Sequence, residues 1–396
     1  MFFQICPAQT IGFSIELQVL PRLKISNANT TYLPGISAYG KAWYQSDAIS
    51  VMGQNGPVIE VDQFQYNGGI EALQTLYDGG LTSRKKNLEK ASLNAELGKI
   101  ETDLYQLNSL VTDLFFSAIL LDKSREIIQL KTQLLHKRLE EMESAFNSGI
   151  VKQNDLEKFR TELLLTQQKM LEIEKQRQQV IISLQIYTGI EINPETTFIS
   201  TEDSFHSSKT NRPEYSYFDA EIQRLESMAR LQKSRNLPFL VAYGQAGYSY
   251  PGLNFYENEP DYYYIVGLKL SWTLFDWKQN KRETQVILKQ REIIQTNRTD
   301  FDQKISIALS QKLIEQQKLV ALIEIDNQLI DQLSAISKGS EAALLNGVIT
   351  STDYLEDMNA EIKARLDRES HKTELQKTTL QYQLMEGIDT SIFTQN

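Results

Sequence analysis

The chain has 396 residues, of which 51 are acidic and 41 basic, giving a net charge of −10. This acidic balance and the lack of a basic stripe argue against nucleic-acid binding. The single cysteine, Cys6, excludes a disulfide framework and a cysteine-based zinc site, and the three histidines are too dispersed for metal binding. The sequence has no glycine-rich phosphate loop and no catalytic-triad spacing, so we expect neither a cofactor nor enzymatic activity.

The nine prolines leave two proline-free runs, 58–193 and 261–396, of 136 residues each. Because proline interrupts helices and central strands, these runs predict very long secondary-structure elements. We find no apolar run near the roughly 18 residues that a transmembrane helix needs. A search for apolar runs does not detect the strands of a membrane barrel, because their apolar residues alternate with polar ones.

Residues 1–32 are expected to be an incomplete N-terminal helical segment, in which Pro21 interrupts any helix. The first twenty residues lack the basic region and the small-residue cleavage site of a signal peptide, and the residues before Cys6 do not resemble a lipoprotein box. We therefore expect either a cytosolic chain or one whose true start is missing.

An internal duplication organises the rest of the chain. Residues 33–40 match 237–244 at an offset of 204, and two later matches share an offset of 198: 75–78 with 273–276, and 148–151 with 346–349. We therefore divide the chain into a first repeat at 33–211 and a second repeat at 213–396.

Each repeat begins with two predicted strands, at 35–46 and 62–77 and then at 238–250 and 262–275. Apolar residues occupy the even positions and polar residues many of the odd ones, which is the alternation of a strand with two different faces. Aromatic residues gather toward the strand ends, as in the girdle of a membrane barrel. This predicted girdle comprises Tyr44, Phe64, Tyr66, Tyr248, Tyr262, Tyr264 and Trp272. The alternative is a soluble sheet whose apolar face is covered by helices.

Long helices follow the strands in both repeats. Narrow heptad seams of apolar residues predict coiled-coil packing, and a helix over 82–146 would be about 100 Å long. In chain order, the first repeat continues with a tip at 147–152, a helix at 153–187 and an equatorial linker at 188–212. The second repeat has helices at 214–236 and 278–344, a tip at 345–350, a helix at 351–386 and a C-terminal tail.

The order and spacing of several short motifs carry a family resemblance. These motifs are Tyr32–Pro34, Leu76–Gly80, Ser148–Ile150 followed by Asp155, Leu184–Gly189 and Arg212–Glu214. Over about 28–387 the chain resembles the TolC-type outer-membrane efflux proteins. One difference concerns the turn after the second strand of each repeat: Gly79 and Gly80 become Trp277 and Lys278, so we expect that turn to differ.

The resemblance implies a mainly α-helical protein with a membrane β-barrel. Three protomers of a homotrimer would each give four strands to one twelve-stranded barrel in the outer membrane, in contact with its lipid, and their helices to a periplasmic tunnel. Such a channel is a passive exit duct of a tripartite efflux pump or a type I secretion system. It would be opened at its periplasmic tip by a periplasmic adaptor protein and an inner-membrane transporter of the RND or ABC type.

The resemblance also implies functional residues at the tips. Asp353 and Glu356 would form acidic rings at the periplasmic entrance, although helix capping explains acidic residues there equally well. Thr350 with Asp353, and Asn154 with Glu157, have the spacing of a capping box. The family's gating arginine position holds Ile349 here. As a hypothesis, the adaptor docks on the tip residues, which are Ser148, Gly149, Ile150, Val151, Asn346, Gly347, Val348 and Ile349. We expect the four apolar residues of this set to be exposed.

A soluble periplasmic or cytosolic coiled-coil scaffold is the competing interpretation. In that case the strands would form a small capping domain and the apolar face would be covered by protein. Purification as a membrane-bound trimer would reject the scaffold, and purification as a soluble monomer or dimer would reject the channel.

Overall fold

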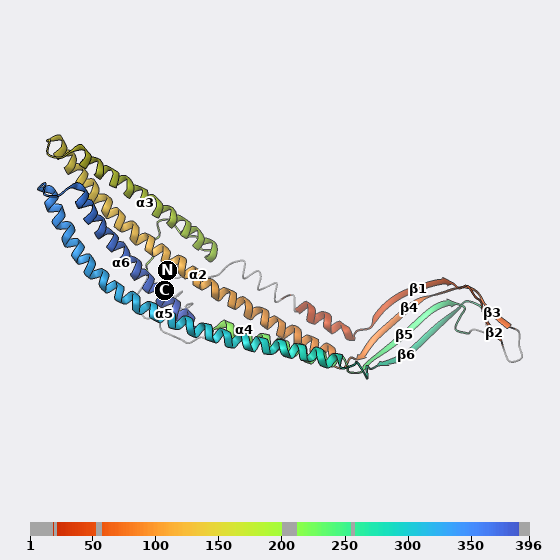
Figure 1. Cartoon of the computed structure of the whole chain (residues 1–396). Helices are drawn as coiled ribbons and strands as arrows, with labels where there is room; N and C mark the ends of the chain where they lie inside the picture. Colours follow the sequence, from red (N-terminus) through yellow and green to blue (C-terminus); the bar gives the residue numbers. More distant parts are fainter. Residues whose placement is uncertain (1–18, 20–21, 53–57, 200–211, 255–257, 388–396) are drawn as a thin grey trace. The chain divides into compact units, whose positions relative to one another are not determined.

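The computed structural model describes residue 19 and residues 22–52, 58–199, 212–254 and 258–387. Residues 22–29 are helical, and the remaining elements follow in chain order (Figure 1). They are η1 (Thr30–Tyr32), β1 (Gly35–Tyr44), β2 (Ile49–Met52), β3 (Val58–Val61), β4 (Phe64–Tyr77), α2 (Leu81–Asn147), α3 (Gln153–Thr188), α4 (Pro213–Ser234), β5 (Phe239–Tyr250), β6 (Asp261–Ser271), α5 (Gln279–Leu345) and α6 (Ser351–Met385).

The chain divides into two compact units. Among the described residues, we call those within Lys99–Ser216 and from Arg298 onward the helical unit, and those up to Gly98 together with Tyr217–Asn297 the sheet unit. Helices α2 and α5 each begin in the sheet unit and end in the helical unit.

In the sheet unit, four antiparallel strands form one sheet in the order β1-β4-β5-β6 (Figure 1). The register pairs even residues with even residues across the sheet, as in Ala42 with Tyr66 and Ala246 with Tyr264. Because side chains alternate between the faces of a strand, all even-numbered residues up to the irregularity near Tyr77 share one face. The alternation predicted from the sequence therefore becomes two chemically different faces.

Three strand boundaries differ by two or more residues from those predicted. Strand β4, predicted to begin at residue 62, begins at Phe64. The strand predicted at 262–275 ends at Ser271, which pairs with Phe239. The next residue opposite would be Pro238, which has no N–H to continue the ladder. The strand predicted at 35–46 ends at Tyr44. Strands β2 and β3, which follow β1 and precede β4 in the chain, form a separate hairpin that was not predicted.

The two turns that join a strand to a long helix are alike, so the expected difference between them is wrong. Gly79 and Gly80 have φ values of +65° and +78°, and Trp277 and Lys278 adopt +54° and +62°. A preceding carboxylate holds each turn: Asp78 accepts the N–H groups of Gly80 and Thr82 at 2.9 and 2.8 Å.

Asp276 accepts the N–H groups of Lys278 and Asn280 at 2.9 and 3.0 Å. The repeated Asp–backbone geometry, rather than glycine, therefore sets the left-handed conformation in the second repeat.

In the helical unit, α2 packs against α3 and α6 around two apolar clusters. One cluster joins Phe115, Ala118 and Leu184 to Phe198 of the linker and to Leu384. The other cluster lies toward the tips and comprises Leu135, Met142, Leu156, Phe159, Tyr354, Leu355 and Met358. These clusters are the buried seams that the heptad pattern predicts.

Among the described helices, only α2 contains a stretch long and apolar enough, by length and composition, to cross a membrane. The expectation of no such stretch was therefore too strict. However, the apolar part of α2 includes Val111, Phe115 and Ala118, which are buried in the cluster with α3 and α6. Packing within the helical unit accounts for this composition.

Alanine substitutions at Gly79 and Gly80 test the role of the first turn. A Cβ at Gly80 would meet nothing within 4 Å, so only the left-handed φ disfavours alanine there. We expect Gly80→Ala to lower the free energy of unfolding by about 1 kcal/mol. A Cβ at Gly79 would lie 2.5 Å from Cβ of Leu237, so Gly79→Ala should cost about 1–3 kcal/mol more. Thermal unfolding followed by circular dichroism measures both variants, and equal losses would contradict this account.

Candidate membrane-facing sheet and helical tips

The even-numbered side of the sheet, which we call the apolar face, bears no charged residue within its paired strands. Its side chains are Ile36, Ala38, Ala42, Tyr44, Phe64, Tyr66, Ile70, Ala72, Gln74, Leu240, Ala242, Ala246, Tyr248, Tyr250, Tyr262, Tyr264, Val266, Leu268 and Leu270. The odd-numbered side, which we call the polar face, includes charged and amide side chains, namely Lys41, Gln65, Asn67, Glu71, Gln245, Asp261 and Lys269.

The apolar face is exposed, unlike that of a water-soluble sheet. Its residues Tyr262 and Val266 are 82% and 79% exposed. The polar face is mixed, because Ser249 and Tyr263 are only 6% and 8% exposed whereas Lys269 is exposed. A water-soluble sheet buries its apolar face. This sheet therefore presents an apolar surface that the described residues leave uncovered.

Aromatic side chains occupy both ends of the apolar face. At one end, the Tyr66 ring lies 6.3 Å from Phe64 and 5.8 Å from Tyr250, and Tyr248 lies 4.9 Å from Tyr262. At the other end, Trp272 follows β6 directly and is 57% exposed.

The chain from Tyr264 to Trp272 would span about 26 Å if it were extended throughout. At the tilt of about 35–45° of barrel strands, this length covers about 20 Å along the membrane normal, which is most of the apolar band of about 25 Å in outer-membrane barrels. All seven predicted girdle residues thus lie at the ends of the apolar face, six in strands and Trp272 just beyond one.

Hydrogen bonds join side chains from different strands across the polar face. Gln245 donates to Glu71 at 2.8 Å across β4 and β5, and Tyr263 donates to Asn67 at 2.7 Å. Strands β1 and β6 each pair on one side only within the described sheet. Two rows of backbone N–H and C=O groups are therefore available to further strands.

The two helical tips have the same backbone geometry. At the first tip, Ile150 N–H bonds to Ala145 C=O and Gly149 N–H to Phe146 C=O, and Gly149 has a φ of +76°. These two bonds define a Schellman motif, which favours glycine at its left-handed position. The second tip repeats the motif at Gly347, which has a φ of +69°.

The apolar tip residues divide into two pairs. Ile150 and Val348 are 79% and 74% exposed. Val151 and Ile349 instead pack partly buried against the apolar cluster near the tips, so the expectation that all four are exposed is wrong for these two. Ser148 and Asn346 bond their side chains to backbone carbonyls one turn earlier, at 3.0 and 2.8 Å.

The two acidic residues near the second tip have different environments. Asp353 forms the predicted capping box with Thr350, accepting its backbone N–H at 2.9 Å. Hydrogen bonds from the Thr350 backbone and hydroxyl lower the pKa of Asp353. Glu356 is exposed, one turn further along α6. The second capping box is wrong, because α3 begins at Gln153 with Lys152 as its N-cap, which places Asn154 inside the helix.

Polar contacts between helices near the tips were not predicted. Arg138 of α2 is only 3% exposed and forms ion pairs with Glu141 and with Glu341 of α5. Lys158 of α3 donates to Thr352 of α6 at 2.6 Å. Glu341 and Thr352 lie about 200 residues from their partners. A charged residue beside an apolar seam gives no signal of which other helix it will meet.

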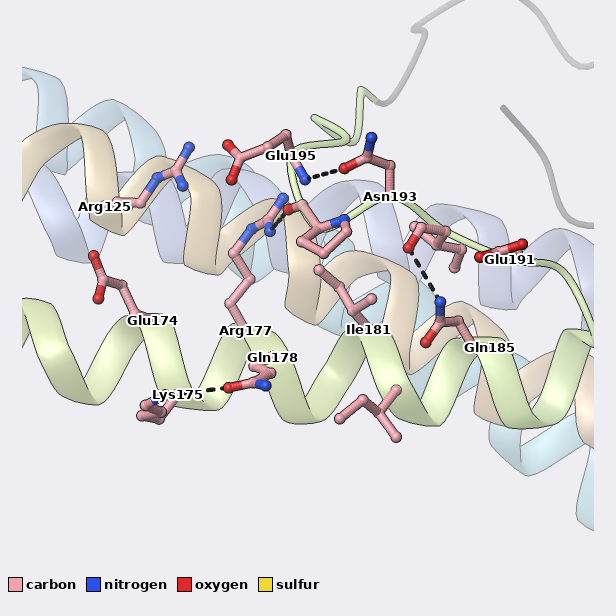
Figure 2. Close-up of a pocket in the computed structure, with 13 residues that line it drawn as sticks. Arg125, Glu174, Lys175, Arg177, Gln178, Ile181, Gln185, Glu191, Asn193 and Glu195 are labelled. Atoms are coloured by element: carbon pink, nitrogen blue, oxygen red, sulfur yellow. Dashed lines mark hydrogen bonds between the residues drawn. The ribbon is translucent and has the colours of Figure 1, made fainter.

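A pocket of about 850 Å³ lies where the linker returns along α3, as Figure 2 shows. Arg177, only 6% exposed, donates to Asp122 of α2 at 2.6 Å and to the linker carbonyls of Pro194 and Thr196. Arg177 thus attaches the linker to the α2–α3 pair. No cluster suited to a metal ion occurs among the described residues, and we interpret this pocket as structural.

No family model matches the sequence, and no curated protein matches it. Solved structures do match, and they define the fold as that of the TolC-type outer-membrane channels, in agreement with the resemblance seen in the sequence. CusC matches with a TM-score of 0.72 and 14% identity over 95% of this chain and 88% of that chain.

VceC of Vibrio cholerae matches with a TM-score of 0.70 and 11% identity over 96% of this chain and 93% of that chain. The CmeC channel of Campylobacter jejuni matches with a TM-score of 0.68 and 12% identity over 96% and 83%. Similarity at these identities establishes the fold.

Replacing the cap of α6 should loosen its first turn. Thr350→Ala removes the side-chain acceptor for the Asp353 N–H, at a cost of about 1 kcal/mol, so hydrogen exchange there should quicken about fivefold. Lys152→Ala is the matched control, because the N-cap of α3 makes no side-chain bond. If both variants quicken exchange equally, the capping box does not hold this turn.

The stability of the first turn of α6 should also depend on pH. Because the folded-state pKa of Asp353 is lowered, its contribution to stability is complete above the unfolded-state value of about 3.8 and is lost as pH falls through the lower folded-state value. Protection factors for the first turn of α6 should therefore decline below about pH 4. Asp353→Asn should remove this pH dependence, and a decline that persists in the variant would assign the effect to another group.

Proposed function

We propose that the chain is one protomer of an outer-membrane channel, a passive exit duct for efflux or type I secretion. The observation that carries this proposal is the exposed apolar face of the sheet, which bears no charged residue. A charge-free apolar face with aromatic residues at both ends suits lipid, and the opposite hydrogen-bonded polar face suits an aqueous lumen. The outer membrane is the location that fits such strands.

The open edges of the sheet support assembly with further copies of the chain. In lipid, every backbone polar group must be satisfied within protein, so a sheet with two unpaired edges requires more strands. Four strands cannot enclose a channel, whereas three copies supply twelve. A homotrimer therefore satisfies the backbone and closes the lumen.

Helix α5 also requires neighbours. In the helical unit it bears an exposed apolar stripe at Ile307, Ile314, Ile325, Leu329 and Ile336, which are 43–65% exposed. The spacings of 7, 11, 4 and 7 residues keep these side chains on one side of the helix, as in coiled coils. Other copies in a helical tunnel would bury this stripe.

At the tips we assign two further roles. Ile150 and Val348, exposed beside the Schellman glycines, are suited to dock a periplasmic adaptor, which would act with an RND or ABC transporter of the inner membrane. Three copies of Asp353 and Glu356 would give the entrance a negative potential that favours cations. In this role Asp353 both caps α6 and contributes charge.

Arginine substitutions on neighbouring residues of β6 test the proposal. Val266→Arg places a charge on the apolar face, and we expect it to cost about 2–4 kcal/mol in lipid and to abolish recovery from outer-membrane fractions. Ile265→Arg, on the polar face of the same strand, should be tolerated. The protein is produced in a Gram-negative host behind a secretion signal and assayed as a heat-labile trimer in detergent gels.

Either of two results would reject the channel. One is recovery of the unmodified protein as a soluble monomer or dimer, which is the expectation for a coiled-coil scaffold. The other is equal tolerance of the two arginine variants, because lipid contact requires the apolar face to exclude a charge that the polar face accepts.

A further inference from the structure

One row across the polar face consists of two tyrosines separated by two glycines. Tyr39 of β1 pairs with Gly69 of β4, Gly69 pairs with Gly247 of β5, and Gly247 pairs with Tyr263 of β6. Figure 1 shows β1 and β6 at the two edges of the sheet with β4 and β5 between them. The large side chains thus stand on the edge strands and the smallest residues on the middle strands.

The two tyrosines meet above the glycines. Their hydroxyls hydrogen-bond to each other, and the Tyr263 hydroxyl donates to Oδ1 of Asn67 at 2.7 Å, so Tyr39 donates to Tyr263. The edge strands are three strand spacings apart, about 14 Å. Upright side chains could not meet over that distance, so both rings must lie along the sheet. The 8% exposure of Tyr263 agrees with this.

The glycines make the flat arrangement possible. A Cβ at Gly247 would lie 3.2 Å from Cε1 of Tyr263 and 2.6 Å from the carbonyl oxygen of Gly68. A Cβ at Gly69 would lie 2.4 Å from the carbonyl oxygen of Ala246. The two middle strands therefore approach closely at this row, and any side chain there would displace backbone or lift a ring.

We propose that Tyr39 and Tyr263 form a clasp that holds both rings against the wall of the lumen and so sets its free cross-section at this level. The inference rests on the proposed channel function. In a trimer, six phenol rings share this level, and each is free to lean into the lumen once its hydrogen bond is lost. Tyr39 and Tyr263 are in this sense positioning residues for conduction.

Single-channel conductance of the purified full-length trimer in planar bilayers tests the clasp. Tyr39→Phe removes one hydrogen bond and leaves Tyr263 bonded to Asn67, whereas Tyr263→Phe removes both bonds. We expect a loss of conductance with added current noise that is larger for Tyr263→Phe than for Tyr39→Phe. Tyr264→Phe, the adjacent residue on the apolar face, is the matched control and should conduct like the unmodified protein.

A double alanine variant shows whether a loss of conductance comes from the position of the rings or from a distorted barrel wall. With both rings absent nothing can lean into the lumen, so the Tyr39→Ala/Tyr263→Ala protein should conduct at least as well as the unmodified one. Phenylalanine variants that conduct like the Tyr264→Phe control would overturn the clasp, as would a double variant with the low conductance of Tyr263→Phe. If Tyr263→Phe does not assemble, Tyr39→Phe decides. An unmodified trimer that inserts without conducting would reject the channel itself, and the clasp with it.

Discussion

An apolar sheet face that the described part of the chain does not cover is the constraint on which the rest of the structure depends. Water cannot accommodate the exposed surface of Tyr262, Val266 and Leu268 without a large cost, and lipid cannot accommodate the unpaired edges of β1 and β6. In the proposed channel both costs disappear, because further strands extend the sheet within a membrane. The polar face is consistent with the same solution, because Gln65, Ser249 and Tyr263 are already packed against their neighbours and leave a hydrogen-bonded wall facing water.

At the junction between each strand and its long helix, a carboxylate allows residues other than glycine to adopt a left-handed conformation. Asp78 and Asp276 accept backbone N–H groups two and four residues later, and they impose the same left-handed pair on Gly79 and Gly80 as on Trp277 and Lys278. A comparison of residue types alone suggested two different turns. The hydrogen-bond geometry shows one turn used twice, which keeps strand and helix in the same local relation in both repeats.

The sequence predicted the elements well where a simple period governs them. Alternation identified β1, β4, β5 and β6, and heptads identified α2, α3, α5 and α6, each to within a few residues. Predictions were poorer where a contact partner decides the outcome. Lys152 rather than Asn154 caps α3, Val151 and Ile349 turn toward the apolar cluster near the tips, and Arg138 finds Glu341 on another helix. Spacing along one helix cannot reveal such partners, because they come from segments about 200 residues away or from the way a tip folds back.

By itself, the sequence determined the period, length and order of the elements and the chemistry of each strand face, because these depend on neighbours a few residues apart. The tertiary structure decided what those faces meet. The register across four strands placed Tyr39 and Tyr263 over Gly69 and Gly247, and it gathered aromatic rings from all four strands at one end of the apolar face. Register depends on hydrogen bonds between strands that are distant in the chain, and a shift of one residue would have exchanged the two faces.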